Sequence, residues 1–477
     1  MEYALKERIE GIKKKLTSED ILVFEFDSRA GKKFAVIYAD GIVDKNMIGE
    51  LVIKPLADAK EDATAEEVKK LLASPDVKDG KGEKDAIKNI SDGNAALFID
   101  GEKSFYIIGV KAPPGRAVAE PPTQVTVKGP REGFTEDIKV NLGLVRKRVK
   151  TDKLKVKTLT VGDESQTTVA ICYIDGICPK GLPEQIEQKI LANEIDIVPD
   201  SSYVAGFVSK RPDSLFKRNS TCEKPDIFSA KICEGRVGII VDGSPIALTV
   251  PYMLVEDFQA AEDYYAVRYR STILRVLRFA AVLIGVLLPA IYVCAQLFKI
   301  QLIPAQLLFK IASSVAGIPL SPSVEIFLTL FVLEVLNEAS IRMPKYVGLA
   351  LSVVGALVLG DTAVKAGIIS TPAVIIIAFS AICLYTVPDL VETTTTLRLA
   401  FLIIAGSIGT FGLVLAIAFI ICYLVTEQDY GVPLLAPYAP LILHDMRDSL
   451  YKSNLQTLNK RPRVLKTRNQ VRFKTKK

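Results

Sequence analysis

Two long uncharged segments constrain this chain more than any other feature. A run of 20 residues without a charged side chain follows Arg278, and a run of 28 follows Arg398, although the chain before them is densely charged. About 20 apolar residues are enough for a helix to cross a hydrocarbon core of about 30 Å. At 477 residues the chain is also longer than one core usually organises. We therefore expect a soluble region followed by an all-α membrane domain over residues 271–426.

Four segments of this domain have the composition of membrane spans: 274–298, 346–366, 372–387 and 399–425. The stretch 301–342 is apolar as well, but Glu325, Glu334 and Glu338 interrupt it. A charge at the middle of a bilayer costs at least about 2.5 kcal/mol. We therefore expect 301–342 to be re-entrant or interfacial, with its acids at the interface, in water or against protein. A full crossing would change the number of spans by one.

Charge around the spans predicts their orientation. Four arginines lie between Arg268 and Arg278, and 11 Lys or Arg residues lie in the stretch 447–477. The positive-inside rule places both ends in the cytoplasm, with 427–477 as a basic C-terminal tail. The tail lacks interleaved aromatic residues, so a solvated end or contact with anionic lipid is favoured over nucleic acid. The charged N-terminus has no apolar core typical of a secretory signal.

The residue content predicts no enzyme, cofactor or metal. The seven cysteines show no CxxC spacing, and His444 is the single histidine, which excludes a histidine-based metal site or catalytic triad within one chain. Neither a GxxxxGK[ST] loop nor a GxGxxG loop occurs. Nucleotide hydrolysis therefore has no support in the sequence.

The soluble region repeats one order of segments. AVIYADGIVDK from Ala35 aligns with AICYIDGICPK from Ala170, and AALFIDG from Ala95 aligns with VGIIVDG from Val237. In each case a β-branched run ends in Asp-Gly, which is typical of a strand that enters a tight turn. Helical periodicity follows the first strand of each copy, over 45–59 and 181–192.

This duplication predicts two α/β subdomains, 1–125 and 126–270. The first includes a proline-rich linker over 111–124. Asp40 and Asp175 occupy the same place in the two copies, so we interpret them as turn formers rather than as an acid and base pair.

One soluble motif stands apart from the repeat, and it is followed by a predicted helix that carries Arg146 and Arg148. It could bind an anion through backbone N–H groups after a Thr135 cap. An interdomain joint held by Arg and Glu is favoured, because no phosphate-binding loop motif accompanies it. The motif consists of Gly129, Pro130, Arg131, Glu132, Gly133 and Phe134.

The second span, 346–366, allows two interpretations that chemistry alone leaves even. It is either a packed interior helix with an i, i+4 charge pair, or a pore helix with an apolar constriction and a charged mouth. The candidate pore-lining residues are Gly348, Val354, Gly355, Val358, Gly360, Asp361 and Lys365.

Six motifs in order resemble the A-subunit family of bacterial spore germination receptors, often called the GerA family, over essentially the whole chain. Two segments depart from the family pattern: 214–226, which resembles it only loosely, and the threonine-rich 386–397. The motifs are VKGPREGFTEDIKVNLGLVRKR at Val127, EGRVGIIVDGSPIALTVP at Glu234, AEDYY at Ala261, LLPAIYV at Leu287, SVVGALVLGDTAVKAGIIS at Ser352 and GVPLLAPYAP at Gly431.

The resemblance implies a multi-pass protein of the spore inner membrane that works with a transporter-like B subunit and a lipoprotein C subunit. It further implies a homo-oligomer, expected to be a pentamer, that forms a germinant-gated channel for monovalent cations. The pore would fall on 346–366, and the motif at Gly129 would serve ring assembly or signalling. Two alternatives remain: the paralogous stage V sporulation protein AF, which would amplify ion release, and a non-conducting scaffold subunit of a membrane transport complex. A scaffold would bury Gly348, Gly355 and Gly360 between helices of one protomer.

Overall fold

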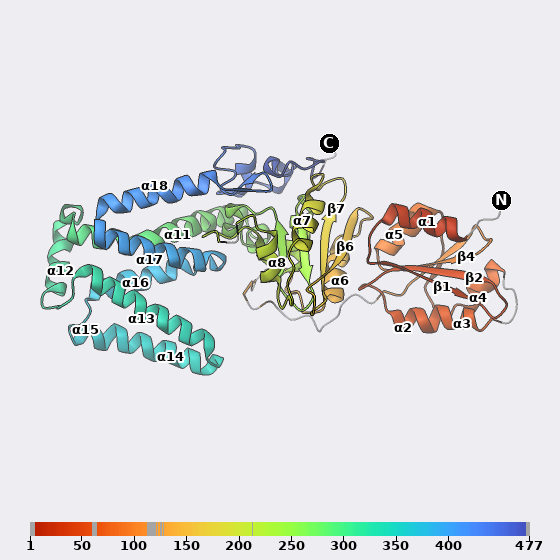
Figure 1. Ribbon diagram of the computed structural model, residues 1–477, viewed down its shortest axis with the longest axis horizontal. Coiled ribbons are helices and arrows are strands. Elements are labelled where there is room, and N and C mark those ends of the chain that lie inside the picture. The colour runs from red at the N-terminus through yellow and green to blue at the C-terminus, as the bar shows by residue number, and fades with distance from the viewer. Residues whose placement is uncertain are drawn as a thin grey trace.

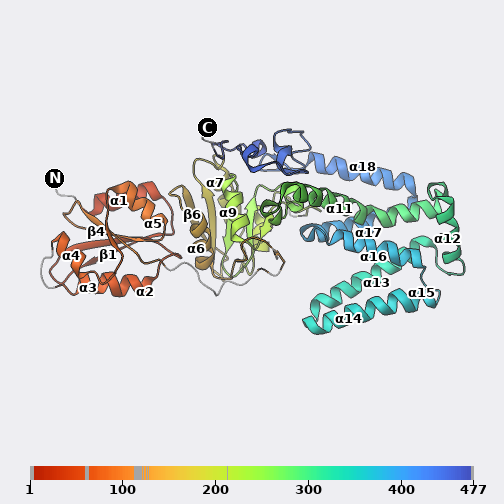
Figure 2. The same cartoon turned by 180° about the vertical axis from the view of Figure 1, so that it is seen from behind.

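The protein is elongated, with two α/β subdomains in series at the N-terminal end and a helical domain at the other end (Figures 1 and 2). This confirms the fold class expected from the sequence. The computed structural model describes residues 5–59, 64–111, 121, 123–124, 126, 128–211 and 213–473. Most of the predicted proline-rich linker, 111–124, lies outside the described residues.

The first subdomain is one antiparallel sheet with helices on its faces. Its five strands have the order β1-β2-β4-β5-β3. The short helix α2 continues through a π turn, Gly49–Ile53, into α3. The elements are α1 Leu5–Leu16, β1 Ile21–Asp27, β2 Lys33–Ala39, α2 Lys45–Ile48, α3 Lys54–Ala57, α4 Ala65–Leu71, β3 Val77–Asp79, α5 Glu83–Ser91, β4 Ala95–Ile99 and β5 Phe105–Ile108.

The second subdomain repeats this plan. Its strands have the order β6-β7-β9-β10-β8, which is the first order with each number raised by five. The elements are α6 Ile138–Arg148, β6 Leu154–Val161, β7 Thr167–Ile174, α7 Leu182–Leu191, α8 Ser201–Val208, β8 Ser220–Cys222, α9 Pro225–Cys233, β9 Val237–Val241 and β10 Ala247–Val250.

The predicted duplication is confirmed. The four aligned strands are β2, β4, β7 and β9, the central strands of the sheets, and the predicted helical segments appear as α2–α3 and α7. In the Asp-Gly turns, Gly41 and Gly176 have φ of +82° and +80°, a conformation that glycine adopts without steric cost. Each copy also begins with a helix, α1 or α6, so the repeat is one element longer than the aligned segments.

The helical domain is built around α11, which packs against α16 and α17. Among the described residues, two helices are long and apolar enough to cross a membrane, Arg268–Leu297 and Pro388–Ile408, and three shorter helices are apolar. The elements are α10 Glu262–Tyr265, α11 Arg268–Leu297, α12 Ala305–Val315, α13 Pro322–Arg342, α14 Lys345–Leu357, α15 Ala363–Lys365, α16 Thr371–Leu384, α17 Val391–Ile408 and α18 Thr410–Thr426, with a π turn, Val358–Thr362, between α14 and α15.

One expectation for this domain is wrong, and one stretch is more helical than its sequence indicated. The predicted span 399–425 is divided at Gly409, whose φ of +77° reverses the chain so that α17 and α18 pack side by side. The stretch 301–342 holds α12 and then α13, a helix of 21 residues that runs back along the domain (Figure 1). The break at Gly409 and the helix α13 each add one helix that runs along the domain to the four predicted. The number of such helices stays even, so both ends of the domain still lie toward the α/β subdomains.

The basic C-terminal segment is folded onto the protein and is not the solvated end that the sequence predicted. It contains a two-stranded hairpin, β11 Gln428–Asp429 with β12 Val432–Pro433, and it lies beside the second subdomain (Figure 1). Val464 and Leu465 are buried against residues of both neighbouring units. Arg468 also pairs with Asp175 in the second subdomain, at 3.1 Å.

Candidate functional site

Helix α14 lies at the outer edge of the helical domain, where it forms a hairpin with α13 away from α11 (Figures 1 and 2). Residues Val347, Ala350, Val354, Leu357 and Asp361 follow one another at steps of three and four, so they share one face of the helix. All five are exposed, with Val354 at 57% and Leu357 at 64%. The edge helix therefore presents an apolar stripe with a carboxylate at one end.

The glycines of this segment lie on a different face. A Cβ at Gly348 would lie 2.8 Å from the carbonyl oxygen of Ser340, and one at Gly355 would lie 2.9 Å from a methyl of Leu336, so both glycines face α13. At Gly360 a Cβ would meet no described atom within 4 Å. The predicted pore-lining residues are therefore split between an exposed face and a packed face of one protomer.

Two further candidates complete this segment. The ammonium of Lys365 lies 2.6 Å from the carboxylate of Asp361, and both side chains are exposed, as the i, i+4 spacing predicts. The backbone of Val358 opens the π turn after α14, while its side chain lies outside the described part of the structure.

The three acids of α13 have different environments. Glu325 is fully buried, and one carboxylate oxygen accepts the backbone N–H of Ser370. Glu334 pairs with Arg398, and Glu338 forms an exposed pair with Arg342 one turn later. The sequence predicted acids that contact protein or face water, and each of these environments fits that expectation.

Arg398 joins the central helices. Its side chain is 2% exposed, and its guanidinium reaches Glu334 on α13 and the hydroxyl of Ser380 on α16, the latter at 3.1 Å. That hydroxyl donates to the carbonyl of Gly285 on α11. The sequence marked Arg398 as the start of an uncharged run but gave no sign of these partners, which lie far away in the chain.

The two segments that depart from the family pattern contact each other at the joint between the second subdomain and the helices. The hydroxyl of Thr393 donates to the carbonyl of Leu215 at 2.9 Å. The ammonium of Lys217 lies 2.8 Å from Asp257 and 3.8 Å from Asp389, just before α17. Burial raises the pKa of Asp257 to about 6, although Lys217 pulls it downward. This joint links the soluble region to α17 through charged groups.

Two other ion-pair groups fix the same end of the helical domain. Glu427, after α18, accepts from Arg218 of the second subdomain. At the start of α11, buried Arg275 bridges Asp263 and Asp448, each at 2.9 Å. The C-terminal segment, the second subdomain and α11 are therefore held as one unit.

The motif at Gly129 lies in the loop before α6. Glu132 pairs with Lys147 and Arg148 at 2.7 and 2.6 Å, and the buried ring of Phe134 meets Phe228 edge-on at 5.5 Å. The expected Thr135 cap is wrong, because Asp137 caps α6 and its carboxylate occupies the place that an anion would take. The rest of the motif, Gly129, Pro130, Arg131 and Gly133, belongs to the same loop.

Arg146 of α6 reaches the first subdomain. Its guanidinium contacts both carboxylate oxygens of Asp20 and the hydroxyl of Ser18, the latter at 3.0 Å. The Arg146 and Asp20 side chains are 1% and 3% exposed. The motif and its helix thus form part of an interdomain joint, the interpretation that the sequence favoured.

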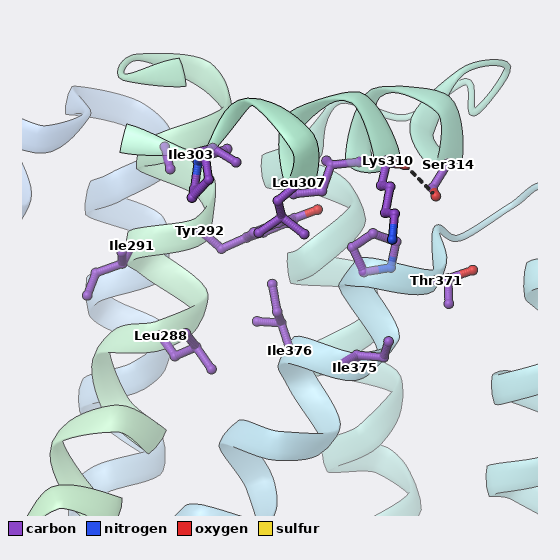
Figure 3. A pocket seen from close by; sticks show the side chains of 14 residues that line it. Leu288, Ile291, Tyr292, Ile303, Leu307, Lys310, Ser314, Thr371, Ile375 and Ile376 are labelled. Carbon is purple, nitrogen blue, oxygen red and sulfur yellow. Dashed lines mark hydrogen bonds between the residues drawn. The ribbon is translucent and has the colours of Figure 1, made fainter. Parts of the chain in front are cut away.

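A cavity of about 500 Å³ opens among α11, α12 and α16 at the end of the domain away from the soluble region. Figure 3 shows Leu288, Ile291 and Tyr292 on one wall and Ile375 and Ile376 on another. Its lining is apolar apart from a few groups, including the Tyr292 hydroxyl and Lys310. Among the described residues, no cluster of three or more His, Cys, Asp or Glu side chains could hold a metal.

Known proteins resemble this chain over nearly its full length. Residues 7–464 match the family described as Bacillus/Clostridium GerA spore germination protein. Spore germination protein KA of Bacillus subtilis (strain 168) is 34% identical over 466 residues, which cover 96% of this chain and 85% of that protein. Spore germination protein GerLA of Bacillus cereus is 30% identical over 476 residues, covering 98% and 97%.

The chain is also similar to a solved structure. It is the N-terminal domain of the A subunit of the Bacillus megaterium spore germinant receptor GerK3, at 25% identity and a TM-score of 0.41. The match covers 52% of this chain and 95% of that one.

Proposed function

Because this chain belongs to the GerA family of spore germination proteins, we propose that it is the A subunit of a nutrient-responsive germinant receptor whose oligomer forms a germinant-gated cation channel. The exposed stripe of α14 carries this proposal. An apolar helix face at the edge of a domain is suited to line a pore or to meet a neighbouring subunit, because nothing in its own protomer covers it among the described residues. Asp361 and its partner Lys365 would form a charged mouth at the end of the stripe.

The proposed setting is the spore inner membrane, with both terminal regions in the cytoplasm. Two long apolar helices, the arginines at the start of α11 and the even number of helical passes support it. The partners would be further copies of this chain, in an oligomer expected to be a pentamer. A transporter-like B subunit and a lipoprotein C subunit would join them. The permeant species would be monovalent cations.

The charged joint around Lys217 supplies a route for the signal. The two soluble subdomains of each protomer, joined by Arg146 and Asp20, would move as a unit in the ring, and Lys217 and Arg218 would pass that movement to α17 and α18. Thr393 of α17 bonds to Leu215, and Tyr423 of α18 bonds to Ser214. The helix ends that carry these residues face the soluble region (Figure 1).

A non-conducting scaffold subunit is the second candidate. Gly348 and Gly355 pack against α13 of their own protomer, which is the arrangement expected of a scaffold helix. The two candidates differ in the role of the opposite face, since the Val354 side chain faces ions in a channel and lipid or protein in a scaffold.

Cation flux through the reconstituted receptor tests the proposal. The purified chain with its partner subunits would be placed in liposomes, and nutrient-dependent K⁺ efflux would be compared for the wild type and Val354→Phe. A matched control is Val414→Phe, because Val414 is 63% exposed on α18. The channel proposal expects Val354→Phe to reduce efflux severalfold and Val414→Phe to leave it unchanged. Equal efflux for all three, with normal assembly, would favour the scaffold.

A further inference from the structure

Glu325 is a carboxylate enclosed by the helical domain. It is 0% exposed and lies near the start of α13, next to Ile326 of the apolar cluster that includes Val293 and Ile377. One oxygen accepts the N–H of Ser370, while Oε2 is buried without a hydrogen-bond partner among the described residues. A buried carboxylate is strongly unfavourable as an anion unless its charge and its lone pairs are satisfied.

A second buried oxygen belongs to the same polar network. The amide nitrogen of Gln296 donates to the hydroxyl of Tyr292 at 2.7 Å, and the amide oxygen of Gln296 has no partner within the described part of the chain. The Tyr292 hydroxyl also interacts with the side chain of Ser370 and with the charge of Glu325. Ser323, two residues before Glu325, faces Gly406 of α17 instead and lies outside this network.

The charge of Glu325 is only partly balanced. The described ion pairs of these helices join Glu334 to Arg398, Glu338 to Arg342 and Asp361 to Lys365, and none includes Glu325. The N-terminus of α16, a helix of 14 residues capped by Ser370, provides roughly half a positive charge. Glu325 also lies in the first turn of α13, so helix dipoles offset its charge in part, but no described cation pairs with it. A carboxylate oxygen and an amide oxygen remain without partners within the part of the chain the structure describes.

We propose that Glu325 and Gln296 form a binding site for a monovalent metal cation, Na⁺ or K⁺. Oxygen ligands suit hard cations, and a single carboxylate matches one positive charge, whereas divalent ions collect more carboxylates. Binding would balance Glu325 and tie α11, α13 and the start of α16 together. This site is independent of whether the α14 stripe lines a pore.

The site has a path to the outside. Tyr292 lines the cavity of about 500 Å³, and Figure 3 shows its ring extending from α11 toward α16. Gln296 lines a second cavity, of about 320 Å³, together with Pro322 and Ala312. Both cavities lie at the end of the helical domain away from the soluble region, so a cation would enter from that side.

Cation-dependent unfolding of the purified full-length chain tests the site. Calorimetric unfolding temperatures would be measured as NaCl or KCl replaces N-methylglucamine chloride at constant ionic strength. A cation that binds the folded state alone raises the unfolding temperature in a saturable way. Glu325→Gln should abolish this rise, and Gln296→Leu should increase the half-saturating concentration severalfold. Glu338→Gln, which changes an exposed acid on the same helix, should leave the response intact.

If Glu325→Gln fails to fold, direct measurement of cation binding to the wild-type chain and to Gln296→Leu still tests the proposal. The wild-type chain should bind about one ²²Na⁺ or ⁸⁶Rb⁺ per protomer, displaced by the unlabelled ion, and Gln296→Leu should bind more weakly. The proposal is overturned if the wild type binds neither ion, or if Glu325→Gln keeps the stabilisation. It is also overturned if unfolding depends on pH but is equal in all three salts, because a proton would then neutralise Glu325.

Discussion

Replacing Arg146 with Met tests whether one buried ion pair holds the two α/β subdomains together. The substitution keeps a long side chain but leaves Asp20, 3% exposed, without its cation. Removing one partner of a buried pair costs about 3–5 kcal/mol, chiefly because the other charge stays buried and unpaired. Since each 1.4 kcal/mol is about tenfold in an equilibrium constant, the joint should open about a hundred to several thousand times more often.

Hydrogen exchange of individual amides measures this opening. The Glu19 amide donates to the Val156 carbonyl at 3.0 Å, and the Val156 amide donates to the Ser18 hydroxyl at 2.9 Å, so both report on the joint. Amides of β9 report on the core of the second subdomain. Arg146→Met should accelerate exchange at the joint by about the factor worked out above and leave β9 nearly unchanged.

Arg148→Met provides the matched control. Arg148 pairs with Glu132 at 2.6 Å, but its side chain is 19% exposed, so its loss should cost no more than about 1 kcal/mol and change exchange at the joint less than tenfold. Adding Asp20→Leu to Arg146→Met should restore part of the protection, because the unpaired charge is removed. The reasoning is refuted if the two arginine variants behave alike, or if β9 and the joint accelerate equally.

Two further predictions concern the charged joint and the α13–α14 hairpin. Burial raises the pKa of Asp257 from an ordinary 3.8 to about 6, so the folded state binds this proton more tightly than the unfolded chain does. The resulting stabilisation, about 3 kcal/mol, is present below about pH 4 and is lost as the pH rises through 6. Unfolding temperatures from pH 4 to 7 should show that the wild type loses stability relative to Asp257→Asn; a constant difference would contradict this. In the hairpin, Gly348→Ala places a Cβ 2.8 Å from a backbone oxygen and should destabilise packing by about 1–3 kcal/mol, whereas Gly360→Ala meets no described atom within 4 Å and should be much milder. Exchange rates of α13 amides in the two variants measure the difference, and equal rates would count against the packing.

The soluble fold was predictable because its signals are local. β-Branched runs that end in Asp-Gly specify strand and turn within a few residues, and the same order occurs twice, so Ala35, Ala95, Ala170 and Val237 were enough to locate four central strands. The first helix of each repeat was missed as a repeated element, because α1 and α6 share little beyond a basic end.

The helical domain was less predictable because its decisive contacts are distant. Gly409 looks in sequence like any small residue of an apolar helix, yet it reverses the chain between α17 and α18. In the sequence, Glu325 and Glu334 argue against a span exposed to lipid. In the structure they contact Ser370, which caps α16, and Arg398 of α17. Hydropathy carries no information about such partners, so it did not predict one continuous helix over Pro322–Arg342.

In the candidate site, too, the sequence does not predict which face of a helix packs against its neighbours. The sequence located the correct segment and its Asp361–Lys365 pair, but it could not separate the face of Gly348 and Gly355 from the face of Val354. The choice of packed face is set by Ser340 and Leu336 on α13. The joint at Lys217 was not predicted either, although it is formed by 214–226 and 386–397, the two segments that depart from the family pattern.

A thiol-accessibility scan of α14 tests the central claim most directly. Single cysteines would be introduced in a Cys422→Ser background, because Cys422 is the native cysteine classed as exposed among the described residues. Nutrient-triggered K⁺ release from spores would then be recorded with and without a charged thiol reagent. The account predicts block at Val347, Ala350, Val354 and Leu357, and little effect at Gly348 and Gly355. Uniform block along the helix, block confined to the glycine face, or no block in an assembled receptor would contradict it.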